Sequence, residues 1–137
     1  MKKISIIFIL VATFIYVLAQ TNTTAASVAR GKIVYTKVCL SCHMVDGGGV
    51  PHLNPPLTVP EYINNKNKMI AIVLKGFADR IPIDEEYYGN NMAPHNDLTN
   101  QQIADVLTYV RNNFGNKAGA VTLADVKAVR NPVKKKS

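Results

Sequence analysis

Two cysteines and a histidine stand close together in the stretch TKVCLSCHMVDGGGV of residues 36–50. Cys39 and Cys42 are the chain's two cysteines, two residues separate them, and His43 follows directly. Three chemistries use this arrangement: a redox-active dithiol, part of a zinc site, and covalent attachment of a haem. The motif therefore indicates a redox group, a metal or a cofactor, and the surrounding sequence has to separate these alternatives.

The context of the motif argues against the first two chemistries. A thioredoxin-like dithiol follows a strand, whereas a helical pattern precedes Cys39. A zinc site needs further closely spaced ligands, and the chain offers only the scattered His52 and His95. In haem attachment each thiol adds to one vinyl group and the adjacent histidine lies beneath the iron. We therefore expect a haem protein, with a zinc or dithiol protein as the alternative.

The first residues have the composition of an export signal. Lys2 and Lys3 precede an apolar run of 16 residues from Ile4 to Ala19. This run is shorter than the roughly 20 residues that a membrane-spanning helix needs. We expect residues 1–19 to be a signal peptide, with an uncleaved anchor as the alternative. Residues 20–26 then form a flexible lead-in, and the protein acts in the periplasm, tethered to the membrane if the signal is retained.

The net charge of +7 is unevenly distributed. Residues 28–115 contain eight basic and eight acidic side chains, whereas the last 22 residues contain six basic side chains and a single acidic one. A basic tail can contact an acidic partner or an anionic membrane surface. Because the core is neutral and the chain carries an export signal, nucleic acid is not an expected partner.

Hydrophobic periodicity predicts an all-α fold with about four short helices and long loops. The expected helices cover residues 28–38, 66–75, 99–114 and 123–130. Ser27 is the expected cap of the first helix, Gly76 ends the second, and Thr99 with Gln102 forms a capping box for the third. These helices leave a thin core, and such small domains usually need a cofactor or a staple to become stable.

From about Ala29 to Asn116 the chain resembles class I cytochromes c. It is most similar to single-haem modules that occur as periplasmic electron carriers and as cytochrome subunits of dehydrogenases and oxidases. The matching stretches are GKIVYTKVCLSCHMVDGGGVPHLNPPL, YYGNNMAPHNDLTNQQI and ADVLTYVRNNFGN. The resemblance implies a cytochrome c fold around one covalent haem over residues 27–116. Residues 117–137 would form a C-terminal extension with a short helix and a basic tail.

The resemblance also implies roles for particular residues. Cys39 and Cys42 would form the thioether bonds, and His43 would be the proximal ligand of the iron. The carbonyl of Pro55 would accept a hydrogen bond from the other ring nitrogen of His43, which fixes the tautomer. Leu57 would pack on the haem.

The resemblance further implies that two helices cross closely. Gly31 and Tyr35 would meet Val106 and Tyr109, which explains a glycine that costs about 1 kcal/mol inside a helix.

Three side chains are candidates for contact with the haem propionates: Tyr87, Tyr88 and Arg80.

The sixth ligand of the iron is expected from the loop GNNMAPH. Met44 adjoins His43, and Met69 is expected in the core. We hypothesise that Met92 is the ligand, on its loop setting and its position in the family. His95 is the rival, although an exposed loop position is its expected role.

If side chains fill both axial positions, one-electron transfer is the chemistry that remains. We therefore expect an electron-transfer protein of the bacterial periplasm rather than an enzyme. It would be a carrier or the cytochrome subunit of a respiratory oxidoreductase, with a dehydrogenase, a reductase or a terminal oxidase as redox partner. A haem enzyme or gas sensor with a labile sixth ligand is the alternative, and rapid binding of carbon monoxide would favour it.

Overall fold

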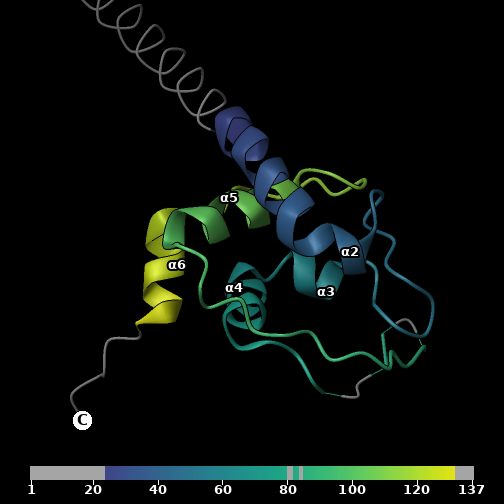
Figure 1. Cartoon of the computed structure of the whole chain (residues 1–137). Helices are drawn as coiled ribbons and strands as arrows, with labels where there is room; N and C mark the ends of the chain where they lie inside the picture. Colours follow the sequence, from purple (N-terminus) through teal and green to yellow (C-terminus); the bar gives the residue numbers. More distant parts are fainter. Residues whose placement is uncertain (1–23, 80–81, 84, 132–137) are drawn as a thin grey trace, which may run out of the picture.

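The fold is a set of helices with long loops, seen in a computed structural model that describes residues 24–79, 82–83 and 85–131. Residues 24–34 are helical and lead directly into the π-helix η1 (Tyr35–Cys39) and helix α2 (Leu40–His43). The later helices are α3 (Pro60–Ile63), α4 (Lys66–Lys75), α5 (Asn100–Arg111) and α6 (Leu123–Arg130), shown in Figure 1. The described residues form no strand and only isolated bridges, so the predicted all-α class is confirmed.

The N-terminal helix crosses α5 at the predicted glycine. Gly31 is buried, and a Cβ atom added to it would lie 2.0 Å from the carbonyl oxygen of Asp105 and 2.8 Å from Cβ of Tyr109. The rings of Tyr35 and Tyr109 lie 5.3 Å apart at the same crossing. Only glycine therefore allows the two backbones to approach so closely.

The start of this helix differs from the prediction. Residues 24–26 are helical rather than a flexible lead-in, so the helix begins before Ser27. The Ser27 hydroxyl instead donates to Oδ1 of Asp105 at 2.6 Å, because α5 brings a stronger acceptor within its reach. The expected signal at residues 1–19 lies outside the described residues. Over the described ranges, no helix combines the length and the apolar character needed to cross a bilayer.

Helices α4, α5 and α6 begin where the sequence predicts. Asn65 caps α4, and Gly76 with φ of 78° follows its last residue. Capping boxes start both α5 and α6. Helix α5 ends at Arg111 rather than at residue 114, because the side-chain amides of Asn112 and Asn113 donate to carbonyls of its last turn. The short helix α3 was not predicted.

The C-terminal extension packs against the domain as far as residue 131. Val121 and Val126 are buried in the same hydrophobic cluster as residues of α4 and α5. The hydroxyl of Thr108 donates to the Val121 carbonyl at 3.2 Å and accepts from the Val121 amide at 3.0 Å. Figure 1 shows α6 in yellow beside α5.

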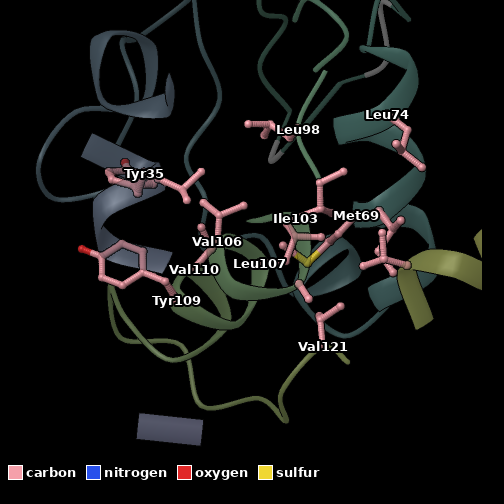
Figure 2. Close-up of a cluster of buried hydrophobic side chains, with 14 of the residues drawn as sticks. Tyr35, Met69, Leu74, Leu98, Ile103, Val106, Leu107, Tyr109, Val110 and Val121 are labelled. Carbon is pink, nitrogen blue, oxygen red and sulfur yellow. The ribbon is translucent and has the colours of Figure 1, made fainter. Parts of the chain in front are cut away.

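The hydrophobic core is built around α5. Figure 2 shows Ile103, Val106 and Leu107 of α5 between Tyr35 on one side and Met69 and Leu74 of α4 on the other. The hydroxyl of the buried Tyr35 donates to the Met44 carbonyl at 2.6 Å, across the end of α2. The core therefore fixes the helix that carries the cysteines.

Two long loops meet on the side of the domain away from α6 (Figure 1). The amides of Gly89 and Asn90 donate to the carbonyls of His52 and Leu53 at 2.8 and 3.0 Å. Loop 44–59 is thereby joined to loop 76–98. Together with α4 and α5, the two loops surround a cavity.

Candidate functional site

An apolar cavity of about 410 Å³ lies between the two loops and the helices. Its volume is in the range of small-molecule and cofactor sites. All six predicted site residues line it: Cys39, Cys42, His43, Pro55, Leu57 and Met92. Apolar side chains of α4 and α5 provide much of the remaining wall: Met69, Ile72, Val73, Val106, Leu107 and Val110. The helices therefore surround a space of cofactor size, as the thin core predicted from the sequence leads us to expect.

The two cysteines are held at the cavity by the helix that precedes them. Cys39 is half-buried and Cys42 is exposed. Burial, followed by the nearby Cys42, raises the pKa of the Cys39 thiol to about 11. Reactive redox dithiols instead have a lowered thiol pKa. A helix rather than a strand also leads into Cys39, so the site differs from a thioredoxin-like dithiol in its setting as well.

The described residues also fail to provide a zinc site, because no cluster of three or more histidine, cysteine or acidic side chains could hold a metal among them. His52 is an exposed loop residue with Nδ1 3.8 Å from Oε1 of Glu86. Of the three chemistries of the motif, haem attachment is the one that the geometry fits.

The His43 imidazole is oriented by the loop that follows it. Nδ1 lies 3.3 Å from the carbonyl oxygen of Pro55. A carbonyl only accepts, so Nδ1 carries the proton and Nε2 keeps a free lone pair. The pKa of His43 lies below its ordinary value. Burial lowers it most and His95 lowers it further, whereas the hydrogen bond to the Pro55 carbonyl raises it. The neutral imidazole is the form that binds a metal.

Glycine makes this loop possible. Gly49 has φ of 69°, and an added Cβ would lie 2.2 Å from the Asn54 carbonyl oxygen and 2.7 Å from that of Pro55. The Leu57 amide donates to the Gly47 carbonyl at 2.8 Å, and the Asn116 side chain donates to the Leu57 carbonyl at 2.8 Å. These contacts hold Pro55 and Leu57 at the cavity.

Met92 reaches the cavity from the second loop. It forms an antiparallel bridge with Phe77. The Phe77 amide donates to the Met92 carbonyl at 2.9 Å, and the Met92 amide donates to the Phe77 carbonyl at 2.8 Å. A Cβ atom on Gly76 would come within 2.5 Å of the Met92 carbonyl oxygen, so glycine permits this close pairing. The bridge fixes the backbone from which the thioether extends.

His95 is half-buried and lines the same cavity, which corrects the expectation that it is an exposed loop residue. Its amide donates to the Val73 carbonyl at 2.8 Å, so the end of α4 holds it there. Both candidate sixth ligands, Met92 and His95, are therefore available at the cavity. Met69 is buried at 7% exposure, as predicted, although it also contributes to the cavity wall.

The sequence reasoning missed Tyr62 of α3. Tyr62 lines the cavity, and its hydroxyl is buried with no hydrogen-bond partner among the described residues. Such an unpaired phenol fits a cofactor with a polar group at that position. Neither Tyr87 nor Tyr88 is among the lining residues, and Tyr87 is 62% exposed. Arg80 lies outside the described residues.

Comparisons with known proteins show what the chain is similar to. A family profile described as cytochrome c matches residues 28–114. The cytochrome c subunit of alcohol dehydrogenase (quinone) from Gluconacetobacter polyoxogenes is 36% identical over 122 residues, which cover 82% of this chain and 24% of that protein. The fructose dehydrogenase cytochrome subunit of Gluconobacter japonicus is 34% identical over 119 residues, covering 81% and 24%.

A shorter relative has a similar match. Cytochrome c-552 of Thermus thermophilus is 28% identical over 96 residues, which cover 66% of this chain and 64% of that protein. In contrast, the chain spans about a quarter of the length of the dehydrogenase subunits it matches.

Proposed function

Because this chain belongs to the cytochrome c family, as a class I c-type cytochrome, we propose that it transfers single electrons through one haem c. Cys39 and Cys42 would hold this haem covalently, and His43 and Met92 would bind its iron. The observation that carries the proposal is the apolar cavity that these four residues line together. The bound haem c supplies an iron that alternates between the ferrous and ferric states.

The protein's own residues set the conditions for this transfer. The Pro55 carbonyl keeps the His43 proton on Nδ1, which orients the ring and raises the basicity of Nε2. The apolar walls of the cavity exclude water and disfavour added positive charge, which raises a reduction potential. With His43 and Met92 both bound to the iron, no position would remain open for a substrate, so the role is electron transfer rather than catalysis.

The partner is a redox enzyme, and we place this chain as the cytochrome component of a dehydrogenase-type oxidoreductase. Two of its relatives are named as cytochrome subunits of dehydrogenases. Met44 and Val45, next to His43, are 39% and 82% exposed and provide an apolar surface for brief docking. The export-signal pattern supports a periplasmic location, with membrane association through the N-terminal segment or the basic tail.

Mass spectrometry of the exported protein tests the cofactor. The expected product has the polypeptide mass plus one haem and begins near Gln20. A Cys39→Ala/Cys42→Ala double variant has no covalent haem, whereas Ser41→Ala, a change between the two cysteines, retains it. A wild-type protein without covalent haem would contradict the proposal.

Carbon monoxide tests the electron-transfer role. The ferrous protein should bind it slowly or not at all, because both axial positions are filled. Rapid binding would instead favour the haem enzyme or gas sensor. Co-purification of the chain with a dehydrogenase from its native membrane or periplasmic fraction would support the subunit role, whereas isolation as a free monomer would favour a carrier.

A further inference from the structure

Helix α6 makes a direct contact with the loop that carries both candidate sixth ligands. Arg130, the last residue of α6, donates from Nη1 to the Asn96 carbonyl at 2.9 Å and from Nη2 to the Leu98 carbonyl at 2.6 Å. Asn96 directly follows His95 and is four residues after Met92. One guanidinium therefore holds two points of the chain at the C-terminal end of this loop.

The support for Arg130 is rigid because α6 is anchored independently. Val126, in the middle of α6, is fully buried in the hydrophobic cluster. Lys66 of α4 pairs with Asp125 of α6, with Nζ 2.8 Å from Oδ1. Arg130 thus extends from a docked helix rather than from a free tail.

The rest of the loop is held from the opposite end. The Phe77 bridge fixes Met92, and the Val73 carbonyl fixes the His95 amide. Residues 92–98 are therefore held at one end by the contacts with Phe77 and Val73, and at the other end by the two hydrogen bonds from Arg130. A planar guanidinium holds two acceptors with defined geometry. Losing it releases the Asn96 carbonyl and leaves this end of the segment held by the burial of Leu98 in the core and by the capped start of α5.

We propose that Arg130 is a positioning residue that acts through the Asn96 and Leu98 carbonyls. It holds the distal loop against the cavity and so determines how readily the sixth ligand yields to an external ligand. The C-terminal extension is then a working part of the haem site. This inference rests on the proposed function, because it assumes a haem whose sixth ligand comes from this loop.

The test is the affinity of the ferric holoprotein for imidazole, which competes with the sixth ligand. Arg130→Gln should bind imidazole about tenfold more tightly than wild type, a change that corresponds to about 1.4 kcal/mol. Hydrogen exchange of the Met92 and His95 amides should also become faster. Lys127→Gln is the matched control, since it removes a positive charge from the same helix at an exposed position, and its imidazole affinity should match wild type.

Arg130→Lys keeps the charge but not the fork, so an intermediate affinity is expected, and this variant serves if Arg130→Gln fails to fold. Equal imidazole affinities for wild type and the Arg130 variants would overturn the proposal. An equal increase in Lys127→Gln would also overturn it, because loss of positive charge from α6 would then be the cause. The mass of each sample separates this result from failure of the proposed function, since only proteins that carry covalent haem enter the comparison.

Discussion

The Nδ1 atom of His43 lies 3.3 Å from the carbonyl oxygen of Pro55, across twelve residues of sequence. The same loop returns to the helix at a second point, where the Gly49 amide donates to the His43 carbonyl at 3.3 Å. His43 is thus held through its ring and through its backbone by one glycine-rich loop. The loop sets both the tautomer and the direction of the imidazole.

Gly49→Ala should displace the Pro55 carbonyl and destabilise the protein. The substitution forces an alanine into a φ of 69° and places its Cβ against two backbone carbonyls. Backbone strain of this kind costs about 1–3 kcal/mol, measured as the free energy of unfolding in urea. Gly48→Ala is the control, because its Cβ would meet only the Asp46 carboxylate, at 3.2 Å. Equal stability of Gly49→Ala and Gly48→Ala would contradict the role given to Gly49.

Gly31→Ala should also destabilise the protein, although alanine is the better helix former. Helix propensity favours the change by about 1 kcal/mol. Overpacking usually costs about 1–3 kcal/mol or more. The cost here should be at the upper end of that range, because the added Cβ would lie 2.0 Å from the Asp105 carbonyl oxygen and the backbone cannot move aside. We expect a net loss of about 2 kcal/mol in thermal or urea unfolding. Gly119→Ala, where nothing lies within 4 Å, should leave stability nearly unchanged.

Local patterns in the sequence predicted much of the fold. The capping box at Thr99 marked the start of α5 because a cap depends on residues three positions apart. The unfavourable helical Gly31 indicated the helix crossing for a similar reason, since only close packing compensates it. The attachment motif, together with the family resemblance, indicated which residues meet at the cavity, as far away in sequence as Met92.

The contacts between distant segments could not be predicted from the sequence. No pattern links Arg130 with Leu98, or Asn116 with Leu57, because each pair is joined only by the packing of distant segments. The unpaired hydroxyl of Tyr62 could not be recognised without the cavity around it. Helix α5 was predicted to be too long because apolar spacing continued past Arg111, while two asparagine side chains compete for its last carbonyls.

Acid should destabilise the protein partly through Asp105. Burial alone raises the pKa of this carboxyl, but hydrogen bonds from Arg30, Ser27 and Gln101 outweigh it and the pKa lies below its ordinary value. The folded state therefore binds the proton less readily than the unfolded chain, whose aspartate pKa is about 3.9. The stabilisation is complete above that pH and is lost as the pH falls through the lower folded pKa.

Asp105→Ala should lower the free energy of unfolding at pH 7 by about 2 kcal/mol, because three donors lose their acceptor. The same variant should lose less stability than wild type between pH 5 and about pH 2. Urea unfolding across this range measures both effects, with the exposed Asp97→Ala as the control. A parallel pH dependence in wild type and Asp105→Ala would show that the carboxyl does not contribute.

The two side chains that compete for the sixth position can be separated by substitution. Met92 is fixed by its bridge with Phe77 and lines the cavity, and His95 lines the same cavity three residues later. We expect Met92→Ala to lose the near-infrared band of methionine-ligated ferric haem and to have a lower reduction potential, because a thioether ligand raises it. His95→Ala should keep the band, as should Met44→Ala, whose side chain is 39% exposed and does not line the cavity. Persistence of the band in Met92→Ala would contradict the assignment of Met92. A wild-type protein without the band, whose spectrum changes in His95→Ala, would instead make His95 the ligand.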